Sequence, residues 1–476
     1  MISMRIMLQF VPEQGPVARA RLEYAFRLFC AIYGHEPITE DLRNSSDMVI
    51  TYAPTCAEGD VCLTKARRFR PLLEPAPEPI RYQSEEDATV LFHGPEDGRE
   101  PDWLAEIFEW VSCADEYACR KHDSVGRVPF EACYVGRHGL NPRKPYAAVA
   151  MAFLQKAIAR VKPQVSTRPM CPVGSAQHLV VNTHDVDLLP MHRISSSYRI
   201  AKNALISLTL FRRTEVATQQ CKTAARVALG APDPLDQINF LTKQEQKHNA
   251  SASYYFLPRR DHRRDGNYSL QQASPVMWSL QNDGIEVGVH GSYRNMERQY
   301  GLGAEFDQMH RVGLHPIGTR QHWLRFTIPQ LVRNVGLAGA GYDTSLGWPY
   351  HAGFRAGACF AFPPYDFEQE APANFLEIPL ALMDQVALKA GRDNGSDPIA
   401  ETLAASRRYG WGGISVVWHP TAFGGGQYPM EVGNRFWQLL EDAQDHHEKW
   451  LSGESFLRLA WPRYQNAGLL PARGWK

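Results

Sequence analysis

Hydrophobic runs alternate with amphipathic stretches from residue 178 onward, and this alternation predicts strands that are followed by helices. Short apolar runs bounded by turn residues predict strands at 178–187, 252–257, 285–289, 375–383 and 414–418. Apolar residues at helical spacing predict helices at 274–282, 295–312, 329–335, 401–409 and 434–450. Repeated strand–helix units are typical of a parallel sheet or barrel with right-handed crossovers. We therefore expect an α/β fold for this part of the chain.

The N-terminal third also mixes both patterns but shows no catalytic constellation. Its patterns predict strands at 5–10, 48–52 and 89–92, and helices at 17–33, 102–113 and 146–161. The proline-rich stretch 163–174 is typical of a linker. We therefore predict an accessory α/β domain of unknown role over residues 1–170 and a larger domain over residues 171–476.

Residues 191–250 are too many for a short loop between a strand and a helix. Helical patterns at 195–210 and 235–247 predict a helical insertion there. Such an insertion could wall a substrate groove, or it could only add packing.

Acidic, basic and imidazole side chains follow the predicted strands where each strand ends. They are Asp185, Asp187, His290, Arg320, His322, Asp343 and His419. A barrel places the carboxyl ends of its strands around one mouth. Asp185 and Asp187 alternate along one strand and should therefore point to the same side. Two converging carboxylates favour a cation beside them, so we predict one metal ligand and one catalytic base, although an isolated Asp-x-Asp more often caps a turn.

The composition is that of a globular protein without an obvious charged partner. Basic and acidic residues balance at 51 each, and 44% of residues are hydrophobic. No basic stripe indicates a nucleic acid partner, and no run of about 18 apolar residues predicts a membrane span. The scattered cysteines and the absence of signal-peptide features lead us to expect a cytoplasmic protein. The sequence leaves the oligomeric state open.

Ordered segments resemble the motifs of the polysaccharide deacetylase family, the NodB-homology carbohydrate esterases. They are Thr183-His-Asp-Val-Asp187, His290-Gly-Ser-Tyr293, Arg320-Gln-His-Trp-Leu-Arg-Phe326, Gly341-Tyr-Asp-Thr-Ser-Leu-Gly347 and Ile414-Ser-Val-Val-Trp-His419. The resemblance covers roughly residues 176–430. These segments are similar to those of a bacterial subgroup whose members carry an N-terminal domain of unknown role.

The resemblance implies a distorted (β/α) barrel that holds one divalent metal, usually zinc. It implies removal of an N-acetyl group from an amino sugar in a polysaccharide, a glycoconjugate or a precursor, with release of acetate. By the same resemblance Asp185 is the catalytic base, Arg320 orients it, and His419 is the general acid. Asp187 and His290 are then metal ligands.

The sequence departs from the family at one ligand position. The second motif usually has histidines four residues apart, but here position 294 is Arg294, which cannot bind a cation. His322, His184 and Asn295 are the alternatives, although His184 should point away from the two aspartates. We predict Asp187, His290 and His322 as the metal ligands; the alternative for His322 is a hydrogen-bonded structural histidine.

Asp343, Trp323 and Trp348 are candidate substrate-binding residues. The tryptophans could stack on a sugar ring or belong to the core, and Asp343 could tune His419 or cap a turn. Two other functions stay open on the same barrel: hydrolysis of a non-sugar amide or cyclic ureide, and glycan binding without catalysis.

Overall fold

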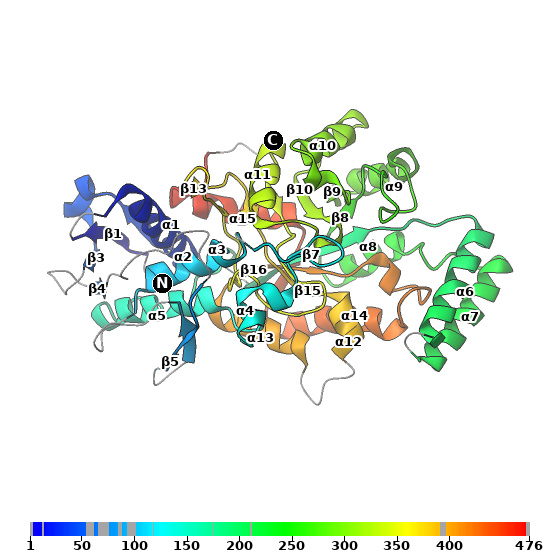
Figure 1. Ribbon diagram of the computed structural model, residues 1–476, viewed down its shortest axis with the longest axis horizontal. Coiled ribbons are helices and arrows are strands. Elements are labelled where there is room, and N and C mark those ends of the chain that lie inside the picture. The colour runs from blue at the N-terminus through cyan, green and yellow to red at the C-terminus, as the bar shows by residue number, and fades with distance from the viewer. Residues whose placement is uncertain are drawn as a thin grey trace.

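Figure 1 shows the computed structural model of the chain. The structure describes residues 3–11, 14–53, 61–64, 76–83, 88–92, 101–117, 119–174, 176–209, 212–390 and 397–472. Within these residues no helix is long and apolar enough to cross a membrane.

The N-terminal region is a small α/β unit. Its parallel sheet has the order β2-β1-β3-β4, formed by β1 (Arg5–Phe10), β2 (Glu36–Ile38), β3 (Met48–Ala53) and β4 (Val61–Thr64). An antiparallel pair, β5 (Ile80–Gln83) and β6 (Ala88–Leu91), lies beside it in the sequence. The helices are α1 (Pro16–Tyr33), α2 (Trp103–Val111), α3 (Ala114–Tyr117), α4 (Tyr134–Arg137) and α5 (Tyr146–Val161). Helix α1 starts with a proline in its first turn and ends at Gly34, whose left-handed φ of 75° suits glycine.

The larger region is built on a curled sheet whose strand pairings are parallel. Its strands are β7 (His178–Val186), β8 (Ser253–Phe256), β9 (Glu286–Gly291), β10 (Gly318–Gln321), β11 (Tyr342–Asp343), β14 (Leu376–Glu377), β15 (Leu380–Met383), β16 (Gly412–Val417) and β17 (Glu448–Leu451). The order is β14-β11-β10-β9-β8-β7-β16-β15, and β17 also pairs with β7. The strands at the two ends of this path, β14 and β15, follow each other directly in the sequence. The sheet must therefore curl back on itself, which confirms the expected distorted barrel after a smaller α/β region.

The helices of the larger region follow the strands, as in a βα repeat. They are α9 (Leu270–Asn282), α10 (Gly301–Arg311), α11 (Ile328–Ala338), α12 (Asp384–Ala390), α13 (Pro398–Tyr409), α14 (Met430–Asp445) and α15 (Gly453–Asn466). The apolar residues of β7 are fully buried, as expected for a central parallel strand. A small antiparallel pair, β12 (Tyr365–Asp366) and β13 (Ala371–Pro372), lies in the connection after β11.

The insertion after β7 contains α6 (Arg193–Thr209), α7 (Thr214–Ala228) and α8 (Ile238–Lys247). The sequence predicted α6 and α8 but not α7. Helices α6 and α7 form a hairpin at one end of the molecule, far from the N-terminal region (Figure 1). Ser197 Oγ donates to Ala224 O at 2.7 Å, which ties the two helices together.

The helix predicted over 434–450 is wrong at its end, because α14 stops at Asp445 and β17 begins at Glu448. His447 has a φ of 51°, so the backbone leaves the helix at that residue. Trp450 is then buried as a member of the sheet. The sequence analysis also did not predict α15.

Buried contacts join the two regions of the chain. Arg355 and Glu116 form a buried ion pair with an Nη2–Oε2 distance of 2.5 Å. The Tyr24 hydroxyl donates to Pro363 O at 2.7 Å. The boundary near residue 170 stays a prediction, since the hydrophobic core runs through both regions.

Candidate metal centre and active site

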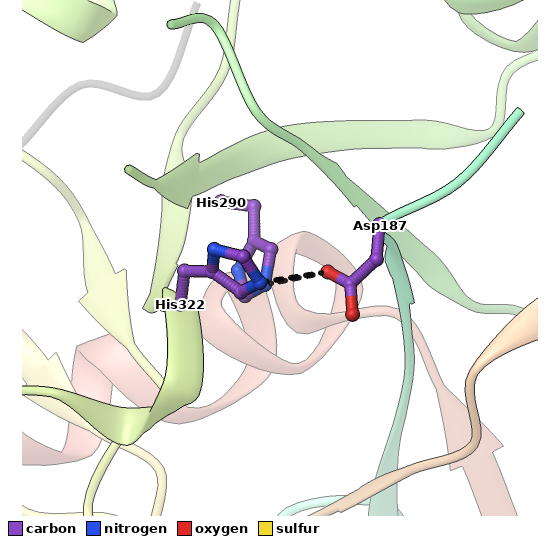
Figure 2. A group of neighbouring side chains, drawn as sticks. All are labelled: Asp187, His290 and His322. Carbon is purple, nitrogen blue, oxygen red and sulfur yellow. Dashed lines mark ion pairs between the residues drawn. The ribbon is translucent and has the colours of Figure 1, made fainter. Parts of the chain in front are cut away.

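Three side chains at the carboxyl ends of barrel strands converge on one point. Asp187 follows β7, His290 lies in β9, and His322 follows β10. Their candidate ligand atoms lie within 4.8 Å of one another. Asp187 Oδ1 lies 3.3 Å from His290 Nε2 and 3.4 Å from His322 Nε2 (Figure 2).

These distances fit a tetrahedral metal ion. Zinc binds carboxylate oxygen and imidazole nitrogen at about 2.0–2.2 Å, so two ligands at a tetrahedral angle lie about 3.4 Å apart. Asp187 Oδ1 is buried and has no hydrogen-bond partner, which is costly unless a cation satisfies it. One carboxylate and two imidazoles also leave a fourth position open, as in catalytic zinc sites. The residues present therefore fit one zinc-like divalent ion.

Contacts behind the ligands orient their imidazole rings. His290 Nδ1 lies 3.0 Å from Arg320 O, and a carbonyl oxygen can only accept, so Nδ1 carries a proton and Nε2 is the nitrogen that would bind a metal. His322 Nδ1 faces Asp265 Oδ1 at 3.7 Å. Burial would raise the pKa of Asp187, but His322 and His290 outweigh it and hold that pKa well below its usual range. Asp187 therefore stays ionised, as a metal ligand must.

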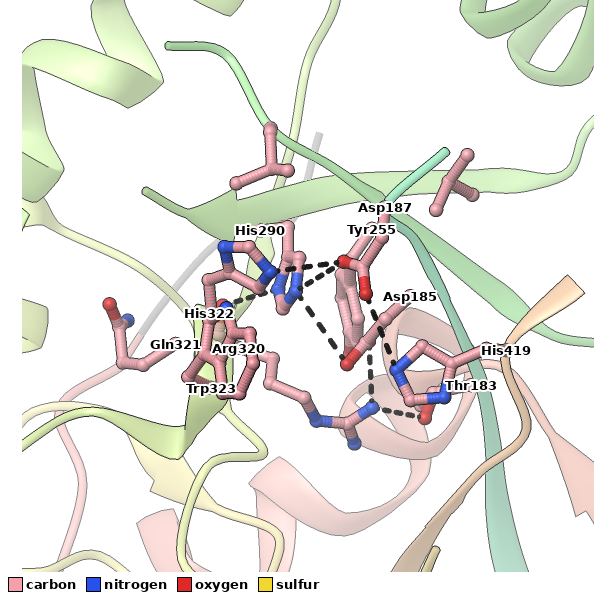
Figure 3. A network of polar contacts seen from close by, with 12 residues as sticks. Thr183, Asp185, Asp187, Tyr255, His290, Arg320, Gln321, His322, Trp323 and His419 are labelled. Atoms are coloured by element: carbon pink, nitrogen blue, oxygen red, sulfur yellow. Dashed lines mark hydrogen bonds and ion pairs between the residues drawn. The ribbon is translucent and has the colours of Figure 1, made fainter. Parts of the chain in front are cut away.

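Asp185 lies beside the three ligands and is paired with a buried arginine. Arg320 Nη1 donates to Asp185 Oδ1 at 3.0 Å and to Thr183 Oγ1 at 2.6 Å (Figure 3). Burial would raise the pKa of Asp185, but the Arg320 guanidinium and His290 outweigh it, and the pKa is lowered. Asp185 is therefore a carboxylate that can accept a proton, held in place by a fixed cation.

His419 follows β16 and faces the same pocket from the other side. Its Nδ1 lies 2.9 Å from Asp384 Oδ2, and Nε2 lies 3.7 Å from Asp187 Oδ2. Asp384 also accepts the backbone N–H of His419 at 2.9 Å. Burial would lower the pKa of His419, but the Asp384 carboxylate outweighs it and raises the pKa to about 10. His419 is therefore a cation that can donate a proton from Nε2.

Asp185, His419 and the three candidate ligands line one pocket of about 160 Å³. Trp323 stands on its wall with 42% of its surface exposed, and Tyr350 is equally exposed. Trp323 has a φ of 63°, so the chain turns sharply directly after His322. This turn separates the two neighbours: His322 is buried in the site, and Trp323 faces the opening.

The structure thus brings six of the predicted residues to the lining of one pocket: Asp185, Asp187, His290, His322, Trp323 and His419. A seventh, Arg320, is fully buried behind the pocket and contacts Asp185. The structure places the other two elsewhere. Asp343 is fully buried and accepts hydrogen bonds from Ser345 N and Oγ at 2.7 and 2.9 Å. Trp348 is 3% exposed and packs edge-on against Phe130. Neither residue lines the pocket.

The alternative metal ligands are engaged in other contacts. His184 Nδ1 faces Trp418 O, and its Nε2 pairs with Glu245 at 2.7 Å. The Asn295 side chain donates to Gln321 Oε1 at 2.8 Å. Arg294 is half-exposed beside Glu297.

Two acids that support the site were not predicted from the sequence. Asp384 comes directly after β15, and Asp265 lies in the connection between β8 and α9. Asp384 could have been found from the same strand-end signal as the other residues. Asp265 carries no such signal, because it lies nine residues beyond the end of β8 at Phe256.

Comparisons with known proteins give similarity only at the level of solved structures. No family model and no curated protein matches the chain. Peptidoglycan deacetylase PdaC from Bacillus subtilis has 10% identity, covering 62% of this chain and 98% of that chain, with a TM-score of 0.28. A mutant CE4 family pseudoenzyme with restored enzymatic activity has 12% identity, covering 62% of this chain and 75% of that chain, with a TM-score of 0.29. These TM-scores are too low for either structure to serve as a template for this site.

Proposed function

We propose that this protein is a metal-dependent hydrolase that removes an N-acetyl group from an amino sugar of a glycan or its precursor and releases acetate. One observation carries the proposal. A three-ligand centre, Asp185 paired with Arg320, and His419 paired with Asp384 all meet at one pocket. Metal-dependent amide hydrolysis uses these three parts: an electrophile for the carbonyl, a base for water and an acid for the amine.

Asp187, His290 and His322 would hold the metal. A bound zinc-like ion would polarise the acetyl carbonyl and lower the pKa of water toward about 7. Asp185 takes the proton from the attacking water, since its carboxylate is ionised and lies 3.8 Å from His290 Nε2, at the edge of the ligand set. Arg320 keeps this carboxylate in place through the reaction.

His419 completes the hydrolysis. Water adds its oxygen to the acetyl carbon, the C–N bond breaks, and the leaving nitrogen needs a proton. His419 Nε2 points into the pocket and supplies that proton, while Asp384 holds Nδ1 and stabilises the cation. The products are acetate and a free amino sugar.

The wall of the pocket supports a carbohydrate substrate. Trp323 and Tyr350 offer exposed aromatic faces, on which the apolar face of a sugar ring can stack. Gln385 and Gln427 also line the pocket and can hydrogen-bond to hydroxyl groups. This mixture of aromatic faces and amides suits a sugar ring with its hydroxyl groups.

The test is acetate release from N-acetylglucosamine oligomers by zinc-loaded wild type and Asp185→Asn. We expect activity in the wild type and a loss of about 10²–10⁴-fold in the variant, the usual contribution of a general base. Lys243→Gln, on the exposed side of α8, serves as the control and should keep full activity. Glycan binding without acetate release would favour the binding barrel, and hydrolysis of cyclic ureides in preference to acetylated sugars would favour the other hydrolase.

A further inference from the structure

A second hollow adjoins the catalytic pocket. Its volume is about 470 Å³, against about 160 Å³ for the catalytic pocket. The two hollows share four lining residues: Tyr350, Gln385, Gln427 and Tyr428. The two hollows therefore meet at these four residues.

The outer wall of this hollow comes from the α6–α7 hairpin, which is the insertion after β7. Asn203 and Ser207 of α6 and Val216 of α7 line it. The hairpin is fixed to the barrel here, since Asn203 Nδ2 donates to Gly426 O and Gln220 Nε2 donates to Gln427 O, both at 3.3 Å. The sequence left open whether the insertion walls a groove or only adds packing, and these contacts support the groove.

The lining of the hollow carries one charge. Arg213 is the only ionisable lysine, arginine, aspartate or glutamate among its described lining residues. Arg213 Nη2 donates to Leu388 O at 3.2 Å, and no ion pair with a carboxylate is found for it in the described part of the chain. The remaining N–H groups of the guanidinium can therefore form the two-pronged contact that arginine makes with a carboxylate or a phosphate.

The rest of the lining fits a sugar. Asn203, Gln385 and Gln427 supply amides, and Ser207 and Tyr350 supply hydroxyls. Apolar Ile206, Val216, Leu388 and Pro429 fill the remaining wall. The amide and hydroxyl side chains can hydrogen-bond to the hydroxyl groups of a sugar. The single guanidinium favours a ligand that also carries one anionic group.

We propose that the second hollow binds the part of the glycan next to the acetylated sugar, and that Arg213 pairs with an anionic substituent on it, a phosphate or a carboxylate. This inference rests on the proposed function, because it takes the catalytic pocket as the place of the acetylated sugar. It makes the α6–α7 hairpin the element that selects anionic glycans.

The experiment compares five trisaccharides built from N-acetylglucosamine. One is neutral, two carry a terminal 6-phosphate at one end or the other, and two carry a terminal glucuronic acid at one end or the other. The proteins are wild type, Arg213→Gln, Arg213→Lys and Arg212→Gln. Arg212 is the matched control, since this exposed neighbour does not line the hollow. Thermal unfolding verifies that each variant is folded.

Binding is measured by calorimetry, so that the result does not depend on turnover. We expect an anionic trisaccharide to bind wild type more tightly than the neutral one, and Arg213→Gln to lose about 10–100-fold of that affinity. Arg213→Lys should restore part of it, and Arg212→Gln should bind like wild type. Preference between the phosphate and the glucuronic acid identifies the anion.

Kinetics then separates the two proposals. With a hydrolysed anionic trisaccharide, Arg213→Gln should raise KM and leave kcat nearly unchanged. Anion binding that depends on Arg213 without any acetate release would overturn the proposed function but not the anion site. Equal binding of neutral and anionic trisaccharides, or equal anion binding by wild type and Arg213→Gln, would overturn the anion site.

Discussion

Arg320→Met is expected to lower the free energy of unfolding more than Asp185→Asn does, although the two residues form one ion pair. Arg320 is fully buried, and Asp185 has only 4% of its side chain exposed. Methionine fills much of the same volume but leaves Asp185 without its cation. Removing one partner of a buried ion pair typically costs about 3–5 kcal/mol.

The opposite change is milder, because Arg320 has other acceptors. In Asp185→Asn the guanidinium still donates to Thr344 O at 3.0 Å and to Thr183 Oγ1 at 2.6 Å. The amide oxygen of asparagine can also accept from Arg320. We therefore expect a loss of about 1–3 kcal/mol, the cost of weakening one charged hydrogen bond.

The double variant tests whether the two residues act as a pair. If Arg320 mainly neutralises Asp185, then Arg320→Met should cost at least about 1 kcal/mol less in the Asp185→Asn background than in wild type. The assay is urea unfolding of the metal-free proteins at pH 7, with free energies of unfolding compared around the cycle. Additivity within about 0.5 kcal/mol would refute the reasoning, since it would mean that the carboxylate does not need the guanidinium.

Two further predictions follow from other buried carboxylates. In Asp384→Asn the pKa of His419 should fall, because the carboxylate that raises it is gone. The alkaline limb of the kcat–pH profile should then move to lower pH. An unchanged limb would contradict the role of His419 as the general acid. Glu448 contacts His178 and Arg407, and although burial would raise its pKa, these partners lower it from 4.5 to about 2. This lowered pKa stabilises the fold above pH 4.5, and the effect is lost as the pH falls toward 2. Glu448→Gln should therefore lower the free energy of unfolding by about 3 kcal/mol at pH 7. The difference in that free energy from wild type should shrink when urea unfolding is repeated from pH 4.5 downward.

The fold class could be predicted because hydrophobic runs and helical spacing are local properties of the sequence. The prediction of a helix through to residue 450 was wrong at β17, because this segment pairs with a strand that is distant in the sequence. Trp450 continues the helical spacing of α14, but its side chain is buried because Glu448–Leu451 pairs with β7, more than 200 residues earlier in the chain. Helix α7 was missed because it is polar over most of its surface and packs mainly on α6.

The features of the site divide in the same way: local sequence patterns predict some of them, and the others depend on contacts between distant segments. Polar residues at strand ends could be found in the sequence, because a parallel barrel brings those ends together whatever the strand order. Asp384 carries the same strand-end signal, but its hydrogen bond to His419 could not be predicted, since that contact depends on β15 lying beside β16. The second hollow could not be found either, because it forms only where the α6–α7 hairpin meets the segment 427–429 and helix α12.

The most direct test of the central claim is the zinc content of purified protein after equilibration with a small excess of zinc and removal of unbound ion. The proteins are wild type, His290→Gln, His322→Gln and, as a control, His310→Gln on the exposed side of α10. We predict about one zinc per chain in wild type and in His310→Gln, and loss of the metal in both site variants. Wild type without zinc, or full zinc content in His322→Gln, would contradict the assignment of Asp187, His290 and His322 as the metal centre.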